Sequence, residues 1–189
     1  MRVLSVLALL LGGCAGEGAS DLTDEVATQP EPALSQETAA VARTVACNAG
    51  EETVFGCKVA SGKRVAVCAG DNGRTYYRFG SDRPELEIEG GAWTHAAYSG
   101  GGEAQIAFEN AGIRYIVFSR VVRTNFAPGE PNYPAISDGV IVLDGEKVIG
   151  LQSCIDPDEV PIDYDLAEKH FPRADELFTF ETERADSDE

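Results

Sequence analysis

Few side chains in this 189-residue chain have the type and spacing that catalysis requires. The two histidines, His95 and His170, lie in no motif that supplies the positioned partner a general base needs. Ser99 lacks the Gly-x-Ser-x-Gly pattern of a nucleophile elbow, and a partner as close in sequence as His95 is unusual for a triad. Gly100–Gly102 precede a predicted strand, and no Lys-Ser/Thr follows, so a phosphate loop is not favoured. We predict no catalytic residues and no cofactor.

Carboxylates crowd the segment after Cys154, where the acidic residues are Asp156, Asp158, Glu159, Asp163 and Asp165. Oxygen ligands at this density are typical of Ca²⁺ sites, but the residue order and the glycine of an EF-hand loop are absent. We therefore predict a solvated acidic connector without a metal. A hydrolase that uses these acids or Ser99 is kept as the least favoured hypothesis.

The segment from Trp93 to Glu103 is the best candidate for a binding loop between strands. Its candidate residues are Trp93, Tyr98, Ser99, Gly100, Gly101, Gly102 and Glu103. Large aromatic side chains beside small adaptable residues are typical of recognition surfaces. The alternative interpretation is that Trp93 packs in the core and the glycines only turn the chain, because most tryptophans are largely buried.

These residues must be positioned by strands, because the chain shows eight runs typical of β-structure. Several runs are joined by short turn signals such as Asp144-Gly145, a strong hairpin signal. One short helix is predicted from Asp163, which can cap it, to His170, before Pro172. The fold class is therefore all-β and mainly antiparallel, a disulfide-linked sandwich or barrel with one short C-terminal helix. The predicted strands span residues 53–60, 64–68, 74–79, 85–89, 104–109, 113–122, 139–143 and 147–153.

Four of the five cysteines are predicted to form two disulfides, since no Cys-x-x-Cys or zinc spacing is present. A two-residue turn at Gly62-Lys63 would place Cys57 opposite Cys68, within disulfide range. This pairing leaves Cys47 with Cys154. The second bridge would close a loop over nearly the whole core and contribute about 4–5 kcal/mol on the chain-entropy model.

The N-terminus has the layout of an export signal, with Arg2 before an apolar run from Val3 to Leu11. The following Gly12-Gly13-Cys14 resembles the bacterial lipobox. This resemblance implies a signal peptide over 1–13, cleavage before Cys14 and acylation of Cys14 with lipid such as palmitate. It also implies an anchor on the periplasmic side of the outer membrane. An ordinary cleaved signal is the alternative.

Composition divides the rest of the chain into three parts. Residues 14–45 are poor in large apolar side chains and predict a disordered tether. Residues 46–180 form the β-rich domain, and residues 181–189 a solvated acidic tail. The formal charge of −17 disfavours binding to nucleic acid, whose phosphates an acidic surface repels.

Several motifs within residues 50–125 resemble a recurrent family of uncharacterised proteobacterial envelope proteins. The shared features are the run Phe55-Gly-Cys57, a hairpin that ends in Val67-Cys68, the run Tyr77-Arg-Phe-Gly80 and the acidic-apolar segment from Glu85. A weaker resemblance is to bacterial envelope inhibitors of lysozyme, which insert a Ser-Gly loop into the enzyme's cleft. Ser99-Gly100 would be the counterpart, although Gly102 stands where that family has a tyrosine.

Together these features predict a non-catalytic binding module of the cell envelope, held to the membrane by its lipid anchor. An acidic chain favours encounter with a cationic protein, for which lysozyme is the candidate that the resemblance implies. A structural or assembly lipoprotein is the main alternative.

Overall fold

The computed structural model describes residues 45–131, 133–155 and 159–187. The predicted signal peptide, Cys14 and the tether up to residue 44 lie outside these residues, as do Asp156 and Asp158. Within the described part, no helix has the length and apolar character needed to cross a membrane.

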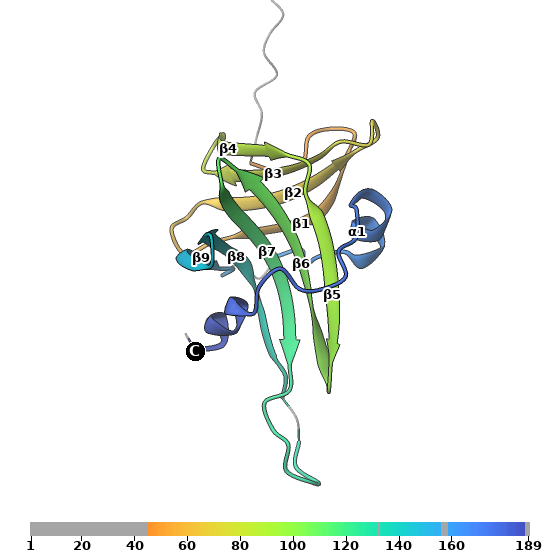
Figure 1. Cartoon of the computed structure of the whole chain (residues 1–189), viewed down its shortest axis with the longest axis vertical. Helices are drawn as coiled ribbons and strands as arrows, with labels where there is room; N and C mark the ends of the chain where they lie inside the picture. Colours follow the sequence, from red (N-terminus) through yellow and green to blue (C-terminus); the bar gives the residue numbers. More distant parts are fainter. Residues whose placement is uncertain (1–44, 132, 156–158, 188–189) are drawn as a thin grey trace, which may run out of the picture. The chain divides into compact units, whose positions relative to one another are not determined.

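The described residues form two antiparallel sheets, each with its strands in chain order (Figure 1). The antiparallel all-β prediction is confirmed, and the two separate sheets correspond to a sandwich-like fold rather than a closed barrel. The first sheet contains β1 (Glu51–Lys58), β2 (Arg64–Gly70), β3 (Thr75–Gly80) and β4 (Pro84–Glu89). The second contains β5 (Ala92–Tyr98), β6 (Gly101–Asn110), β7 (Ile113–Val122), β8 (Ala135–Asp144) and β9 (Lys147–Ser153).

Strand β5 was not predicted, because its sequence, AWTHAAY, shows no clear alternation of apolar and polar residues. It nevertheless pairs with β6 without interruption from Ala92↔Ala107 to Tyr98↔Gly101. Its alternate residues Trp93 and His95 lie on the same face of the sheet, toward the core. The prediction of a loop is therefore wrong for Trp93 to Tyr98, which belong to a regular strand.

One hydrophobic core fills the space between the sheets. We call the side of the second sheet that faces this core its inner face, and the opposite side its outer face. The inner face contributes Trp93, Ile106 and Phe108, which pack with Val67 and Tyr77 of the first sheet. Each fully buried side chain of this size contributes about 1.5–3 kcal/mol relative to an exposed one.

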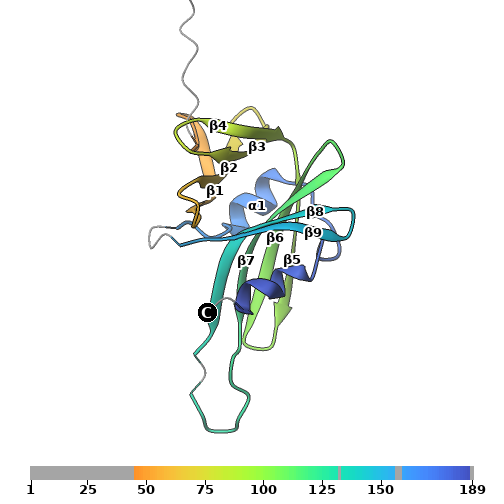
Figure 2. The same cartoon turned by 90° about the vertical axis from the view of Figure 1, so that its left-hand side faces the viewer.

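Helix α1 (Tyr164–His170) packs against this core through Ala167 (Figure 2). Its N-cap is Asp163, whose carboxylate accepts a 3.0 Å hydrogen bond from the Leu166 amide. The helix ends at His170, before Pro172, so both predicted boundaries are confirmed.

The disulfide pairing differs from the prediction. Cys47 bonds to Cys68 and Cys57 bonds to Cys154. The β1–β2 turn is longer than two residues, so Cys57 lies opposite Val65 rather than Cys68. Cys57 and Val65 both face the core, whereas Cys68, three positions further on, points to the other side of the sheet. The side chains of Cys57 and Cys68 therefore point to opposite faces of the sheet, which excludes the predicted Cys57–Cys68 pair.

The two disulfides join different parts of the fold and close loops of different length. Cys57–Cys154 joins β1 to the end of the second sheet across 97 residues, which the chain-entropy model values at about 4–5 kcal/mol. Cys47–Cys68 ties the segment before β1 to β2 across 21 residues, for which the same model gives about 3 kcal/mol.

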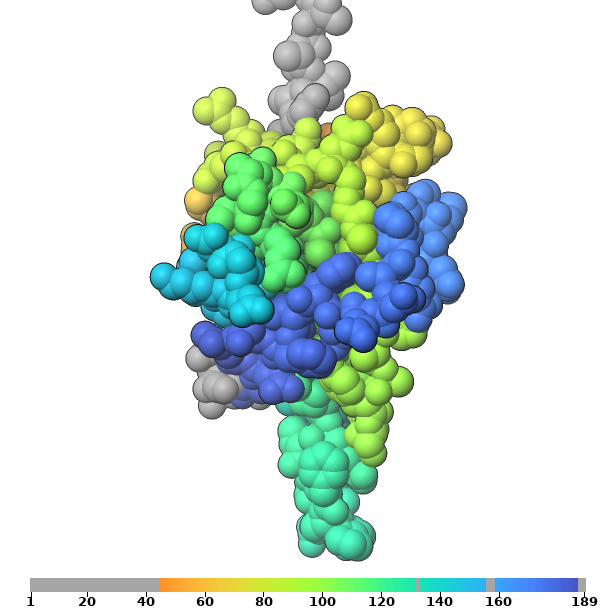
Figure 3. Space-filling view, in the orientation of Figure 1, coloured from red at the N-terminus to blue at the C-terminus, as the bar shows by residue number. Residues whose placement is uncertain are grey.

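The C-terminal segment is a second correction. Residues predicted as a solvated tail form the 3₁₀ helix η1 (Glu181–Ser187), with Thr182 and Ala185 buried. In the space-filling view the C-terminal segment, in dark blue, lies across the strands of the second sheet (Figure 3). The acidic composition of this segment does not keep it in solvent, because the outer face supplies partners for it.

Candidate functional site

The predicted binding residues separate into three groups. Trp93 is 1% exposed and belongs to the core, so the alternative interpretation made for it is the correct one. Its ring stacks on His95 with 5.3 Å between centroids, and His95 in turn contacts Tyr164 of α1. Within the described residues, no hydrogen bond joins Ser99 to His95, so the structure does not form the hypothetical catalytic pair.

The three glycines close a tight hairpin rather than a mobile loop. Gly100 has φ +88°, a conformation that other residues adopt only with strain. A Cβ atom on Gly101 would collide with the carbonyl group of Val121 on β7, and one on Gly102 would lie 2.9 Å from the Ala96 carbonyl oxygen. These positions therefore require glycine, because the turn needs a positive φ and the paired strands leave no room for a side chain.

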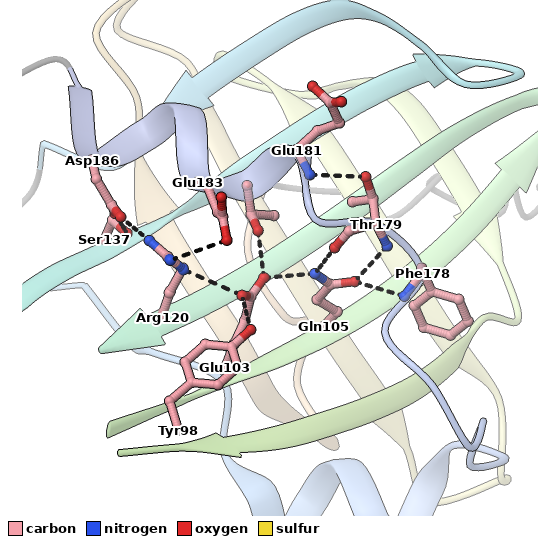
Figure 4. A network of polar contacts seen from close by, with 11 residues as sticks. Tyr98, Glu103, Gln105, Arg120, Ser137, Phe178, Thr179, Glu181, Glu183 and Asp186 are labelled. Carbon is pink, nitrogen blue, oxygen red and sulfur yellow. Dashed lines mark hydrogen bonds and ion pairs between the residues drawn. The ribbon is translucent and has the colours of Figure 1, made fainter. Parts of the chain in front are cut away.

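Glu103 is buried on the outer face, at 1% exposure, and both of its carboxylate oxygens accept hydrogen bonds (Figure 4). One carboxylate oxygen accepts from Gln105 and from the Thr182 hydroxyl, each at 2.6 Å. The other accepts from the Tyr98 hydroxyl at 2.9 Å and lies 3.3 Å from Nε of Arg120. Glu103 is therefore an internal structural group and not an exposed binding residue, which corrects the prediction.

The same network fixes the C-terminal segment to the sheet. Gln105 accepts hydrogen bonds from the Phe178 and Thr179 amides and donates to the Thr179 carbonyl at 2.7 Å. Arg120 forms an ion pair with Asp186 of η1, whose carboxylate also accepts from Ser137. Figure 4 shows these side chains converging between β6, β7 and the C-terminal segment.

Tyr98 and Ser99 contribute to an exposed region at one end of the second sheet. Burial, and then the hydrogen bond to Glu103, raise the pKa of Tyr98 to about 12, so its hydroxyl stays protonated and donating. Ser99 is exposed at the β5–β6 turn. The connection from Arg123 to β8 leaves the sheet at the same end, because Gly102 pairs with Val121 and Val122 with Ala135 (Figures 1 and 2).

We define the tip surface as Tyr98, Ser99, Arg123, Phe126 and Phe180, which line one groove of about 440 Å³. Phe126 is 70% exposed and Phe180 is 67% exposed. The Arg123 guanidinium lies 5.5 Å from the centre of the Phe126 ring, a cation–π contact. The tip surface therefore combines two exposed phenylalanines with an arginine, side-chain types that are enriched at protein–protein interfaces.

The described residues of the connection that carries Phe126 form hydrogen bonds with one another. Asn125 accepts from the Ala127 amide at 2.9 Å and donates to the Pro131 carbonyl, and Thr124 donates to the Tyr133 carbonyl at 2.5 Å. Such bonds reduce the conformational freedom that binding would otherwise remove.

A larger cleft of about 770 Å³ opens on the inner face, beyond the part that the first sheet covers. Ser119 on β7 and Asp138 on β8 lie directly opposite each other in its wall. Its other polar lining residues are Arg120 on β7, Glu159 on the connection after β9 and Tyr164 on α1. The remaining wall is largely apolar and contains Gly101, Gly102, Val121, Ile136, Pro161 and Ile162.

Asp138 is the most unusual group in this cleft. It is 5% exposed, and its Oδ1 is buried with no hydrogen-bond partner among the described residues. Burial raises the pKa of Asp138, while hydrogen bonds with Ser119 and with the carboxyl group of Glu159 act in the opposite direction. Ser119 itself accepts a 2.8 Å hydrogen bond from the Ile162 amide, which leaves its hydroxyl proton available for Asp138.

The remaining residues considered in the sequence analysis, Asp163 and His170, make contacts that stabilise the fold. Asp163 caps α1, and His170 lies 2.9 Å from the carboxylate of Glu52. Among the described residues, one group has the proximity for a metal: Cys47, Cys68 and Glu51. Its two cysteines form a disulfide and offer no thiolate, so it does not fit a metal ion.

Sequence reasoning missed Ser119, Arg120 and Asp138, which belong to strands whose motifs carry no catalytic pattern. The available signal was charge within apolar runs, because Arg120 and Asp138 interrupt strand sequences that are otherwise largely apolar. A buried charge requires a partner or a ligand, so a charged residue within an apolar strand indicates an ion pair or a binding site.

Comparison of the chain with models of protein families, with characterised proteins and with solved structures finds no match.

Proposed function

We propose that this chain is a non-catalytic binding module of the cell envelope that docks onto a cationic protein through the tip surface. The observation that carries this proposal is the pair of exposed phenylalanines, Phe126 and Phe180, around one groove with Tyr98 and Arg123. Each phenylalanine leaves about two thirds of its surface in water, so a partner that covers them gains hydrophobic free energy.

The form of the tip surface favours docking over catalysis. Ser99 and Phe126 lie on connections at the end of a sheet. The two carboxyl groups that line the same groove, Glu183 and Asp186, form ion pairs with Arg120. A serine without a base is a weak nucleophile, whereas a tight Ser99-Gly100 turn is suited to insertion into a partner's groove.

The cationic character of the partner follows from charge. The chain carries a formal charge of −17, which accelerates encounter with a basic protein. Lysozymes are the first candidates, on the resemblance of the Ser99-Gly100 turn to the loop of envelope lysozyme inhibitors. Acylation at Cys14 and attachment to the periplasmic side of the outer membrane are part of the same proposal.

The direct test is inhibition of c-, g- and i-type lysozymes by the purified protein in a cell-wall turbidity assay. We expect inhibition of at least one class at micromolar concentration, and a loss of about tenfold or more in affinity for Phe126→Ala, as for a hot-spot aromatic. Ile149→Ala is the matched control, because Ile149 is an exposed apolar residue of β9 that lies outside the tip surface.

Full lysozyme activity at micromolar protein would contradict the lysozyme assignment. Equal effects of Phe126→Ala and Ile149→Ala would contradict the tip surface as the docking site. Mass spectrometry of protein extracted from the cell envelope tests the anchor, since an acylated Cys14 at the N-terminus is expected.

A further inference from the structure

We propose that the inner-face cleft is a binding site for an organic cation, a primary ammonium or guanidinium group carried on an apolar stem. The site is distinct from the tip surface and does not depend on it. Its recognition groups are Asp138, Glu159 and Tyr164.

The position of Asp138 points to a ligand. Asp138 is 5% exposed and lines the cleft, and among the described residues no donor forms a hydrogen bond with its Oδ1. A buried carboxylate with unused acceptor capacity is costly unless a partner satisfies it. A second cavity, of about 250 Å³, is also lined by Asp138 and Glu159, so the carboxyl pair stands where two cavities meet.

The groups around Asp138 favour a cationic ligand over an anionic one. Glu159 provides a second carboxyl group in hydrogen-bonding contact with it, and Ser119 and Tyr164 add neutral hydroxyls. Arg120 also borders the cleft, but its guanidinium is engaged by Glu103 and Asp186 on the outer face. An anion would therefore face two carboxyl groups with no available cation among the described lining residues.

The size and walls of the cleft select an organic cation over a metal ion. Among the described residues, Asp138 and Glu159 belong to no group of three His, Cys, Asp or Glu side chains whose ligand atoms lie close enough together to hold a metal ion. A volume of about 770 Å³ with Val121, Ile136 and Ile162 in its walls is typical of a site for a small organic group. The Tyr164 ring, 42% exposed, adds a face on which an ammonium or guanidinium group can lie.

The test measures binding of dansylcadaverine, which carries a primary ammonium on a five-carbon stem, to the full chain by fluorescence anisotropy. We expect saturable binding, competition by agmatine, and binding about tenfold or more weaker for the neutral N-acetyl derivative, because a charge-assisted hydrogen bond is lost. A lysine-containing peptide in a parallel arm distinguishes a protein side chain from a free amine as the source of the cation.

Two substitutions locate the site. Asp138→Asn and Glu159→Gln keep side-chain size and should each weaken dansylcadaverine binding by about tenfold or more. Asp144→Asn is the matched control, because Asp144 is an exposed aspartate at the other end of β8. Phe126→Ala should leave the binding unchanged, which separates this site from the tip surface.

Equal affinity for dansylcadaverine and its N-acetyl derivative would overturn the proposal, as would unchanged binding in both Glu159→Gln and a folded Asp138→Asn variant. Stoichiometric displacement of the amine by Ca²⁺ would reassign the site to a metal. If Asp138→Asn fails to fold, Glu159→Gln decides alone, since Glu159 lies on the connection after β9 and outside the strands.

Discussion

The two faces of the second sheet treat a buried carboxyl group in opposite ways. On the outer face, Glu103 has four partners, including Arg120, and the network holds the C-terminal segment in place. On the inner face, Asp138 has a neutral hydroxyl and a second carboxyl group beside it and retains an oxygen without a partner. Burial alone therefore does not distinguish these two carboxyl groups. They differ in their partners, because Glu103 has a cation and several donors whereas Asp138 has neither a cation nor a donor for its second oxygen among the described residues.

The largest effect is expected for removal of the cation from the outer network. Arg120→Ala should lower the free energy of unfolding by about 3–5 kcal/mol, because it leaves Glu103 buried without a compensating charge. Urea denaturation measures this change. Arg74→Ala is the control, since the Arg74–Glu89 pair is exposed and its removal should leave the free energy of unfolding nearly unchanged. Similar losses in the two variants would contradict the structural role of the network.

A smaller loss is expected when one neutral donor is removed from Glu103. Thr182→Val should cost about 1.5–3 kcal/mol, the usual contribution of a hydrogen bond to a charged group. Thr124→Val removes an exposed hydroxyl that donates to a carbonyl and should change stability by about 0.5 kcal/mol or less. If both variants unfold at the same urea concentration, η1 is not held by its bond to Glu103.

On the inner face the expected effect depends on pH. Because burial raises the pKa of Asp138 above its usual 3.8, the folded state keeps this proton more tightly than the unfolded state. Stability from this group is therefore fully present below pH 3.8 and is lost as pH rises through the raised pKa.

An asparagine does not ionise, so Asp138→Asn should not lose stability as pH rises through the raised pKa of Asp138. The free energy of unfolding of the variant should therefore increase relative to that of the parent as pH rises. Chemical denaturation over a pH series, with Asp144→Asn as the control, measures the trend. A trend of opposite sign would show that Asp138 is stabilised as a carboxylate, as Glu51 is: the hydrogen bond from Arg78 is the main cause that lowers the pKa of Glu51.

The smallest effect on stability is expected at the tip surface. Phe126→Ala should change the free energy of unfolding by about 0.5 kcal/mol or less, because the ring is mainly exposed. Phe108→Ala is the matched comparison, since Phe108 is 2% exposed in the core and its truncation should cost about 3–5 kcal/mol. A large loss for Phe126→Ala would mean that the tip surface is structural.

Local patterns predicted most of the fold. Alternating runs and turn signals located eight of the nine strands, and Asp163 with Pro172 located α1. They missed β5 because Ala92–Tyr98 is held by its pairing with β6 and not by an apolar pattern of its own. For the candidate sites the sequence identified Tyr98 and Ser99. It assigned Glu159 to a solvated connector, and it did not indicate that Asp138 would lie across from Ser119.

The order of residues along the chain by itself determined the strand-rich class, the acidic charge and the presence of two disulfides, because composition and short-range periodicity act within a few residues. Only the tertiary structure decided which cysteines pair, that η1 covers the outer face, and that Asp138 is left with an unused oxygen. These outcomes depend on strand register and on contacts between distant segments. A shift of one residue in register turns a side chain to the opposite face, and no local pattern records it.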